Sequence, residues 1–597
     1  MIPTPPRTPL RPLARILRAR DTGGDPAAIE AAARNARIEA GRDKARLRAE
    51  RRLILLAATF VVAFGTVGGR MAVLAGTEPE EPPAVAAGSP IIGQRADITD
   101  RNGRVLATNF ETHALYAQPR QMVDPVRAAT ELAAIFPELD RERLIRDFTG
   151  ERTFVWVRRQ LSPEQMQAVH DIGEPGLLFG PREIRLYPNG AIAAHILGGA
   201  TYGREAVDSA EVVGVAGVER FFDARLRDPA NEGAPLVLSI DLTVQAAMEE
   251  VLAGGMALMN AKGATGILMD AQTGEILAMA SLPDFDPNSR PPVPATGDQS
   301  DNPLFNRALQ GVYELGSVFK IFPVAQALES GLVNVQAMID TRGPMTWGRF
   351  RISDFRNYGP ELSVTDVIVK SSNIGTARIA LQLGPTAQRA FLERLGFLVP
   401  TTVEMAEAST GVPLLPRDWS EIALMTISYG HGLSSSPLHL AAGYASMVNG
   451  GTLVTPTLMR QDTVLPGPRV ISEAVSAEVR DMLRQVVTRG TASFAEVTGY
   501  EVGGKTGTAD KPRPTGGYYD DRVIATFAGA FPMSDPQYVI VVTLDEPVET
   551  SGPEPRRTAG WTAVPVAAEI IRRTAPLLGL RPIIEPAAID GVTEVAN

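Results

Sequence analysis

Seventeen uncharged residues near the N-terminus, Leu53 to Gly69, constrain the fold of this 597-residue chain more than any other feature. As an α-helix they span about 25 Å at 1.5 Å per residue. If the side chain of Arg70 reaches the lipid headgroups, the helix extends to Gly76 and matches the apolar thickness of a bilayer. We therefore expect a transmembrane helix over residues 53–76. The alternative is a helix buried in a protein core.

The charges on the two sides of this segment have opposite signs. Residues 1–52 carry 13 basic and 6 acidic side chains, whereas residues 53–597 carry 45 basic and 62 acidic ones. Because basic flanks stay on the cytoplasmic side, we expect a basic cytoplasmic tail over 1–52 and the acidic body across the membrane. A leading region of this length is too long for a cleavable signal peptide. The acidic body also disfavours nucleic-acid binding.

Composition predicts the state of the segments that flank the helix. Residues 1–26 are rich in Pro and Arg and are expected to be disordered. Residues 27–52 are rich in Ala, Arg and Glu, which predicts a helix. Residues 77–92 form a Pro/Glu-rich linker, and residues 581–597 form a C-terminal tail.

The rare residue types narrow the possible chemistry. There is no cysteine, which excludes disulfide scaffolds, thiolate zinc sites and cysteine nucleophiles. Five histidines occur without metal-ligand spacing, and only six of the 58 basic residues are lysine. Arginine replaces lysine where a plain positive charge suffices, but not where a titratable amine is needed. The six lysines are therefore candidates for chemistry.

The rest of the chain divides into two modules. Residues 93–235 hold a hairpin signal at Asn102–Gly103 and short segments broken by Gly and Pro, which predicts a strand-rich module. Residues 236–580 begin with a strand, a helix and the hairpin pattern TGILMDAQTGEILAMAS, continue with helical patterns, and end with strands from Ala525 and Tyr538. This order predicts an α/β layered domain in which the two distant sheet segments pair.

The segment GSVFK places Ser317 and Lys320 three residues apart at the start of a helical stretch, on one helical face. A neutral lysine there can take the proton of the serine. Its pKa must then fall by roughly three units from a reference value near 10.4, which burial and neighbouring positive charge can cause. An S-x-x-K pattern alone is a weak signal, since about one or two arise by chance in a chain of this length.

Two further motifs follow. KSSNIG supplies Ser371 and Asn373, which alone indicate an N-capping cluster. GGKTGTA supplies Lys505 and two threonines around a glycine, which can form an edge that hydrogen-bonds a ligand carboxylate. Taken alone, this segment could equally be a simple turn. A literal S-D-N sequence, Ser300–Asn302, precedes Ser317 in a Pro-flanked loop. We interpret it as an ordinary loop sequence and not as the motif. No G-x-S-x-G surrounds a serine, which disfavours an α/β-hydrolase.

The order S-x-x-K, S-x-N, K-T-G, with gaps of 54 and 134 residues, is the signature of penicillin-recognising active-site serine enzymes. The chain resembles the class B penicillin-binding proteins, and among them the division-specific FtsI family of peptidoglycan D,D-transpeptidases. RADITDRNGRVLA, RLYPNGAIAAHILG and GVAGVERFFD carry the resemblance in the first module, with Ala96 where glycine is usual. DAQTGEILAMASLPDFDPN and SYGHGLSSSPLHLAAGYASMVNGG carry it in the second.

The resemblance implies a membrane-anchored α/β (α+β) protein with a single N-terminal transmembrane helix. Residues 93–235 would form an elongated, strand-rich pedestal of the penicillin-binding protein dimerisation type. Residues 236–580 would form a transpeptidase domain, an antiparallel sheet flanked by helices and similar to serine β-lactamases.

The resemblance also implies residue roles. Ser317 would attack the penultimate D-alanine carbonyl of a stem peptide and release the terminal D-alanine, with Lys320 as general base. Ser371 would relay the proton to the leaving amine, and Asn373 would hold the substrate amide. The catalytic set is thus Ser317, Lys320, Ser371, Asn373 and Lys505. The carboxylate would be bound by the KTG strand, whose substrate-binding residues are Thr506, Gly507 and Thr508, and backbone N–H groups of Ser317 and Thr508 would form the oxyanion hole.

No cofactor or metal is expected. The implied partners are stem peptides with a D-Ala-D-Ala donor and an amine acceptor, β-lactams, and the polymerase FtsW and other divisome proteins through the membrane helix and pedestal. The implied location is the division septum of a bacterial inner membrane, with the catalytic domain in the periplasm. The alternatives are an elongation-specific class B transpeptidase, a non-catalytic β-lactam sensor and a divisome scaffold.

Two departures from the family pattern stand out. Ile321 and Phe322 separate Lys320 from Pro323, whereas the family commonly has proline directly after this lysine, so the course of the helix here is open. Ser435 and His439 replace more usual residues. We interpret His431 and His439 as packing or hydrogen-bonding residues rather than catalytic ones.

Overall fold

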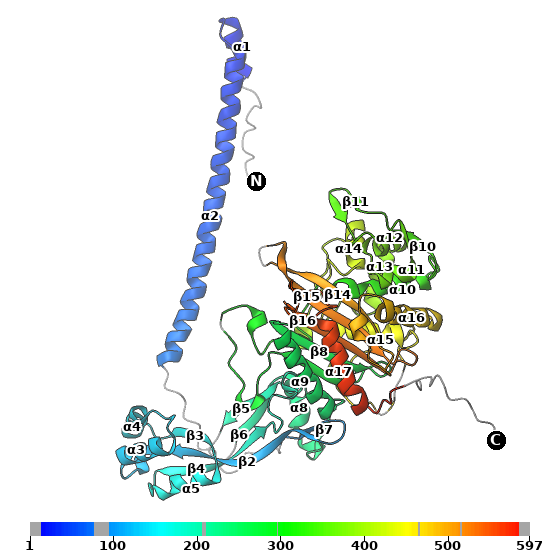
Figure 1. Ribbon diagram of the computed structural model, residues 1–597. Helices are drawn as coiled ribbons and strands as arrows, with labels where there is room; N and C mark the ends of the chain where they lie inside the picture. The colour runs from blue at the N-terminus through cyan, green and yellow to red at the C-terminus, as the bar shows by residue number, and fades with distance from the viewer. Residues whose placement is uncertain are drawn as a thin grey trace, which may run out of the picture. The chain divides into compact units, whose positions relative to one another are not determined.

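The computed structural model describes residues 13–76, 95–205, 210–294, 296–461, 463, 466–513 and 516–583 (Figure 1). The chain divides into two compact units, Met1–Pro83 and Ala84–Asn597. The linker predicted over 77–92 lies wholly outside the described residues. The C-terminal tail predicted over 581–597 lies mostly outside them.

The N-terminal unit contains the helices α1 (Leu13–Asp21) and α2 (Pro26–Gly76). α2 has 51 residues, which makes it about 76 Å long. The carboxylate of Asp25 accepts a hydrogen bond from the N–H of Ala27 at 2.8 Å, in the manner of an N-cap. The predicted tail helix and membrane helix are therefore one continuous helix.

The predicted disorder over residues 1–26 is wrong for Leu13–Asp21, which forms α1. Between Pro12 and Pro26 there is no proline, and the nine residues after Pro12 also contain no glycine. Ala19 of α1 is buried, and Gly24 closes the turn through its N–H, which donates to the Ala19 carbonyl at 2.8 Å. The chain thus leaves this short, proline-free helix through a turn at Gly24 and then enters α2.

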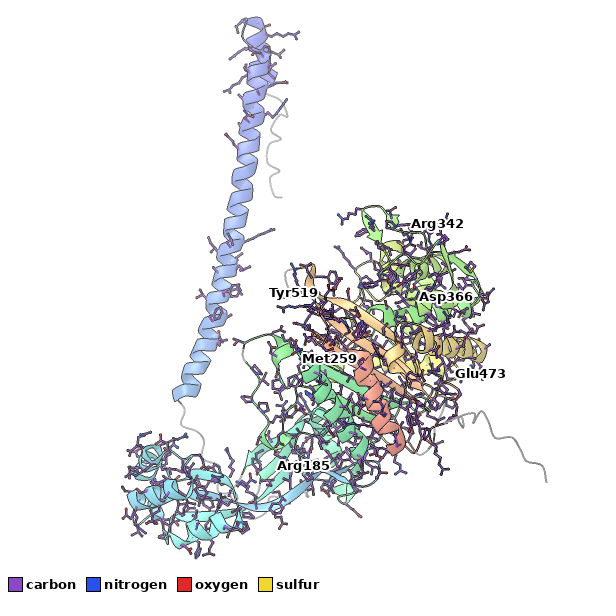
Figure 2. The ribbon with its side chains drawn as sticks, viewed as in Figure 1. Arg185, Met259, Arg342, Asp366, Glu473 and Tyr519 are labelled. Atoms are coloured by element: carbon purple, nitrogen blue, oxygen red, sulfur yellow. The ribbon has the colours of Figure 1, made fainter. Side chains whose placement is uncertain are left out.

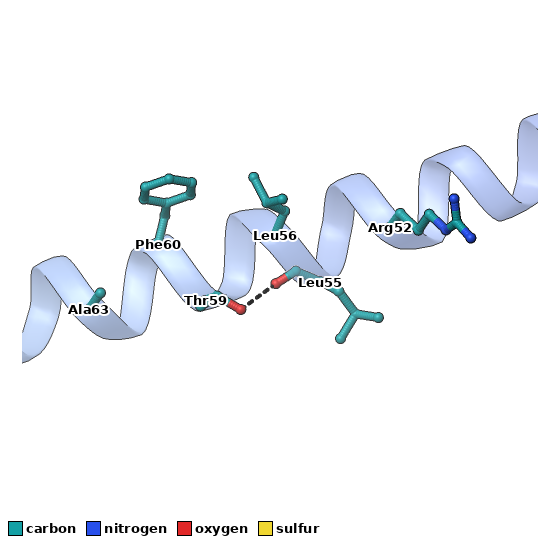
Figure 3. Close-up of a pocket in the computed structure, with 6 residues that line it drawn as sticks. All are labelled: Arg52, Leu55, Leu56, Thr59, Phe60 and Ala63. Atoms are coloured by element: carbon teal, nitrogen blue, oxygen red, sulfur yellow. Dashed lines mark hydrogen bonds between the residues drawn. The ribbon is translucent and has the colours of Figure 1, made fainter. Parts of the chain in front are cut away.

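The stretch Arg52–Gly69 of α2 is long and apolar enough to cross a membrane, and none of it is buried inside the protein. Figure 3 shows apolar side chains such as Leu55 and Phe60 projecting from this stretch. The hydroxyl of Thr59 donates to the carbonyl of Leu55 at 2.9 Å, so this polar group is satisfied without water. By length and composition this stretch fits the transmembrane helix that the sequence predicts.

The first part of the larger unit is a strand-rich module, as predicted. Its main sheet has the order β3-β2-β1-β7, with β4 also paired to β2, and a second sheet pairs β5 with β6. The predicted hairpin at Asn102–Gly103 joins the first two strands. The elements are β1 (Ile98–Thr99), β2 (Val105–Ala117), α3 (Pro125–Ile135), α4 (Arg141–Thr149), β3 (Val155–Leu161), α5 (Pro163–Asp171), β4 (Leu177–Leu186), α6 (Ala194–Leu197), β5 (Gly199–Glu205), β6 (Ala210–Ala216), α7 (Gly217–Phe221), α8 (Asp223–Leu226) and β7 (Leu236–Val237).

A buried carboxylate joins the three sequence segments of this module that carry the family resemblance. Glu219 of α7 is fully buried and accepts hydrogen bonds from Arg95 Nη2 at 2.6 Å and from Arg185 Nε at 2.7 Å. The hydroxyl of Tyr187 also donates to Glu219, at 3.3 Å. Because removal of one partner would leave an uncompensated buried charge, this cluster ties the segments firmly together.

The catalytic module is built on a five-stranded antiparallel sheet in the order β14-β15-β16-β8-β9. The predicted pairing of distant segments is confirmed, since β16 lies beside β8 with Val541 opposite Ile267. The predicted central hairpin is also confirmed and joins β8 to β9. The strands are β8 (Gly263–Asp270), β9 (Ile276–Leu282), β14 (Gly503–Pro512), β15 (Tyr518–Phe531) and β16 (Tyr538–Asp545).

Helices cover both faces of this sheet (Figure 1). The helices α9 (Leu242–Leu258) and α17 (Ala563–Leu577) pack against each other on one face. On the other face α15 (Pro437–Val448) lies under the central strands and α16 (Glu473–Arg489) under β14. The fold is therefore the helix-flanked antiparallel sheet that the resemblance implies.

A group of short strands and helices, which we call the head, lies beyond one end of the sheet (Figure 1). Figure 2 labels Arg342 and Asp366 on it. Its elements are β10 (Met338–Asp340), β11 (Met345–Trp347), β12 (Phe350–Ile352), β13 (Glu361–Ser363), α11 (Val364–Val369), α12 (Asn373–Leu383), α13 (Pro385–Arg394) and α14 (Glu421–Ser428).

Candidate active site

Ser317 and Lys320 lie on a short 3-10 turn, Gly316–Lys320, that leads directly into α10 (Ile321–Glu329), as the sequence predicts. Ser317 is partly exposed, whereas the side chain of Lys320 is completely buried. The displaced Pro323 falls in the first turn of α10, where backbone N–H groups have no partner within the helix. It therefore leaves the helix below Lys320 undisturbed.

Aromatic packing fixes this turn. The rings of Phe319, Phe322 and Phe397 contact one another edge to face, with centroids 4.9–5.1 Å apart. The hydroxyl of Tyr444, on α15, donates to the carbonyl of Val318 at 2.8 Å and is fully buried. The backbone beside Ser317 is thus held by both the core and a hydrogen bond.

Two glycines allow the serine turn and the KTG strand to approach closely. A Cβ added to Gly316 would lie 2.8 Å from the carbonyl oxygen of Thr508, and one added to Gly507 would lie 2.2 Å from that of Leu315. Gly316 also has a φ of +63°, a backbone conformation that residues other than glycine rarely adopt. The backbone of Ser317 therefore lies next to that of Thr508 on β14, which forms an edge strand of the sheet rather than a simple turn.

Ser371 and Asn373 lie at the junction of α11 and α12. The predicted capping role falls to Ser372, whose hydroxyl accepts a hydrogen bond from the N–H of Gly375 at 2.9 Å. Ser371 precedes the cap and has φ +62°, a left-handed conformation that is uncommon for serine. The side-chain amide of Asn373 donates to the carbonyl of Ser353 at 2.9 Å.

The two lysines meet on one hydroxyl group. Lys320 Nζ lies 3.1 Å from Ser371 Oγ and 2.5 Å from the Ser371 carbonyl oxygen, and Lys505 Nζ lies 3.0 Å from the same Oγ. Among the described residues both hydrogen bonds of Lys320 Nζ go to Ser371. A hydroxyl has one proton, so Ser371 can donate to a neutral amine while it accepts from a charged one. The arrangement can therefore move a proton between the two lysines.

The electrostatics favour a neutral base. Burial lowers the pKa of Lys320 well below its ordinary value, the positive charge of Lys505 lowers it further, and the carboxylate of Asp354 opposes both. Burial lowers the pKa of Lys505 to about 7. These shifts favour the neutral form of Lys320, which is the form that can accept a proton, while Lys505 is close to its midpoint at neutral pH.

The threonines of the KTG strand are tied to their surroundings. Thr506 Oγ1 shares a hydrogen bond of 2.7 Å with Thr491 Oγ1, and Thr508 Oγ1 accepts from the N–H of Ala559 at 3.0 Å. Both alternate with Lys505 along β14, so they share one face of the strand. Seven predicted side chains thus lie on three segments that the fold brings together, those of Ser317, Lys320, Ser371, Asn373, Lys505, Thr506 and Thr508.

Comparison with known proteins agrees with this geometry. Residues 264–572 match the penicillin-binding protein transpeptidase domain, and residues 90–232 match the penicillin-binding protein dimerisation domain. The chain belongs to the penicillin-binding protein transpeptidase family.

Relatives of this penicillin-binding protein include peptidoglycan D,D-transpeptidases named FtsI. It is 36% identical over 500 residues to the "probable peptidoglycan D,D-transpeptidase FtsI" of Caulobacter vibrioides, with 82% of each chain covered. It is 30% identical to the peptidoglycan D,D-transpeptidase FtsI of Escherichia coli K12, with 76% of this chain and 79% of that one covered. The crystal structure of penicillin-binding protein 3 from Mycobacterium tuberculosis with aztreonam has a TM-score of 0.63 and 26% identity, covering 83% of this chain and 98% of that one.

Sequence reasoning missed a group of residues at the rim of the serine turn. The carboxylate of Glu314 accepts hydrogen bonds from the N–H of Gly432 at 2.7 Å and from the hydroxyl of Tyr518 at 3.0 Å. The ring of His431 lies between Tyr429 and Tyr518, with centroids 5.5 and 6.5 Å away. These residues come from three distant segments, so no spacing in the sequence connects them.

The two histidines near the site differ. His439 is buried, its Nδ1 lies 2.8 Å from Ser436 Oγ and its Nε2 lies 2.7 Å from the Val399 carbonyl oxygen. Burial lowers its pKa, so it is a neutral ring whose two nitrogens have local partners. Nδ1 of His431 is buried without a hydrogen-bond partner among the described residues. The surroundings of both histidines agree with packing or hydrogen-bonding roles.

The lysine pKa shifts predict a bell-shaped pH dependence for acylation of this protein by a carboxylate-bearing penicillin. The rate should fall about tenfold per unit as acid protonates Lys320, and again above pH about 7 as Lys505 loses the charge that attracts the carboxylate. Stopped-flow fluorescence with a labelled penicillin measures both limbs.

Lys505→Arg provides the control, because arginine stays charged throughout. The alkaline limb should disappear in this variant whatever its absolute rate. An alkaline limb that persists would assign it to another group.

Proposed function

We propose that this protein cross-links peptidoglycan stem peptides at the division septum through an acyl-enzyme on Ser317. Its membership of the FtsI-type transpeptidases supports the activity and the binding of β-lactams. The observation that carries the residue assignment is the bridge from Lys320 through Ser371 to Lys505, directly below the serine turn.

The first step forms the acyl-enzyme. The oxygen of Ser317 attacks the carbonyl carbon of the penultimate D-alanine, and its proton passes to the neutral Nζ of Lys320. The negative charge on the carbonyl oxygen is met by the backbone N–H groups of Ser317 and Thr508, whose neighbouring backbones the glycines bring together. Lys505 and the hydroxyls of Thr506 and Thr508 hold the terminal carboxylate, with the small Gly507 between them. Asn373 holds the substrate amide.

The second step breaks the bond to the terminal D-alanine. The proton held by Lys320 passes through the hydroxyl of Ser371 to the departing nitrogen, so D-alanine leaves as an amine. The amine of a second stem peptide then attacks the ester carbon, gives up a proton along the same path and restores the hydroxyl of Ser317. The product is a new amide cross-link.

The anchor sets where this chemistry happens. With the basic residues 1–52 in the cytoplasm and α2 across the membrane, the catalytic module works on the periplasmic side. The membrane helix and the pedestal are the surfaces available to partner proteins of the septum, among them the polymerase FtsW. The FtsI names of the relatives support a role in division rather than elongation.

Labelling with fluorescent penicillin tests the enzyme assignment. The full-length protein in detergent should form a covalent adduct that maps to Ser317 and persists, because the proposal includes no carboxylate for deacylation. Ser317→Ala should abolish the adduct, and Ser371→Ala should slow its formation by about 10²-fold or more. Labelling of Ser317→Ala at the wild-type rate would contradict the proposal.

Cell shape tests the septal assignment. Depletion of the protein should give filamentous cells, and expression of the wild-type gene should restore division. Ser317→Ala should not restore division, since the proposed acyl-enzyme needs this hydroxyl, whereas a scaffold role does not. Round cells after depletion would move the assignment to elongation, and rescue by Ser317→Ala would favour the scaffold alternative.

A further inference from the structure

Asp354, in the loop after β12 of the head, accepts hydrogen bonds from the turn that carries the S-x-N motif. Its Oδ1 accepts hydrogen bonds from the N–H groups of Asn373 at 2.6 Å and Ile374 at 3.0 Å. Its Oδ2 accepts from the hydroxyl of Ser372 at 2.7 Å. The carboxylate thus binds three consecutive residues at the start of α12, the position where the helix dipole favours negative charge.

The same loop also orients Asn373. The residue before Asp354, Ser353, accepts the side-chain amide of Asn373 through its carbonyl at 2.9 Å. With one amide hydrogen used in this way, the side-chain oxygen of Asn373 and its second hydrogen are left for another partner. Two adjacent residues of the head therefore fix both the backbone and the side chain of Asn373.

The hydrogen bonds of Asp354 begin at Ser372, one residue after Ser371. The backbone conformation of Ser371 must be held by neighbouring groups. Ser371 has φ +62°, and such conformations persist only where the surroundings hold them. On the other side, the N–H groups of Ser371 and Ser372 donate to Ile368 and Val367 of α11 at 3.2 and 2.9 Å. The left-handed residue is thus held from α11 and from Asp354 together.

We infer that Asp354 is a positioning residue for the transpeptidation reaction: it holds Ser371 where its hydroxyl joins Lys320 to Lys505, and it presents Asn373 to the substrate. This inference rests on the proposed function of Ser317 and its neighbours. The loop after β12 is then part of the catalytic apparatus, since the hydrogen-bond partners of Ser353 and Asp354 are residues of the second motif and its flank.

The charge of Asp354 provides a signature that a purely structural residue lacks. The carboxylate raises the pKa of Lys320, in opposition to burial and to the charge of Lys505. Among the described residues, His431 in the loop before α15 also has an electrostatic link to Lys320. Loss of the carboxylate charge should therefore move the acid limb of acylation to lower pH.

The test compares acylation by fluorescent penicillin in full-length variants in detergent. Asp354→Ala removes all three hydrogen bonds and should lower the second-order rate constant about 10²-fold, as expected for misplaced catalytic groups. Asp354→Asn keeps an oxygen for the two N–H groups but loses the charge. Its rate should fall about tenfold, and its acid limb should move to lower pH.

Asp340→Asn is the matched control. Asp340 is another head aspartate, and it pairs with Arg342 at 3.0 Å and with Arg378 of α12 at 3.3 Å, away from the second motif. This variant should acylate within twofold of the wild type. Thermal unfolding of each variant checks that the comparison is made on folded protein, and Asp354→Asn carries the test if Asp354→Ala does not fold.

The outcomes separate this inference from the proposed function. Wild-type labelling that is absent, or that survives Ser317→Ala, removes the proposed function before any Asp354 variant is needed. If wild-type labelling depends on Ser317 but both Asp354 variants acylate at the wild-type rate, only the inference fails. It also fails if Asp354→Asn slows acylation no more than Asp340→Asn, or without a shift of the acid limb.

Discussion

A single hydroxyl group between two buried amines is the contact on which this active site depends. Ser371 Oγ lies within 3.1 Å of both Lys320 Nζ and Lys505 Nζ, and both lysines are completely buried. Two ammonium ions so close together and out of water would each cost several kcal/mol in desolvation alone. The stable arrangement keeps Lys320 neutral, and a neutral lysine is a base. The burial that makes these residues unfavourable as charges is therefore what makes them useful beside Ser317.

The remainder of the catalytic module maintains that burial and that alignment. The aromatic cluster and the Tyr444 hydrogen bond hold the serine turn from below, and Gly316 and Gly507 let the KTG strand close against it. β14 has a free edge in the sheet, so the motif can face both the turn and a ligand. The head supplies the third side, with Ser371 and Asn373 at the junction of α11 and α12 and Asp354 hydrogen-bonded to that junction. Three segments separated by more than fifty residues meet because each belongs to a different layer of one fold.

The sequence predicted the parts of this account that local pattern encodes. The membrane helix, the two hairpins and the strands from Ala525 and Tyr538 follow from periodicity and turn residues, and the three motifs follow from residue type and order. Asp354 could not be found in this way, because a loop carboxylate 17 residues before Ser371 has no characteristic spacing. The contact of Glu314 with Tyr518 likewise exists only after the sheet forms. The prediction of disorder was wrong over α1 because it rested on the composition of residues 1–26 as a whole. The segment Leu13–Asp21 contains no proline and can form a helix.

The protonation state of Lys320 is the central claim, and the scarcity of lysine makes it directly measurable. With only six lysines in the chain, NMR of protein carrying isotope-labelled lysine side chains gives few signals, and Lys320→Arg identifies the relevant one. A signal with the chemical shift of a neutral amine at pH 7, lost in Lys320→Arg, is the predicted result. If all six lysines remain protonated until pH about 10, the ordinary value for an exposed amine, Lys320 is not the base and the account is wrong.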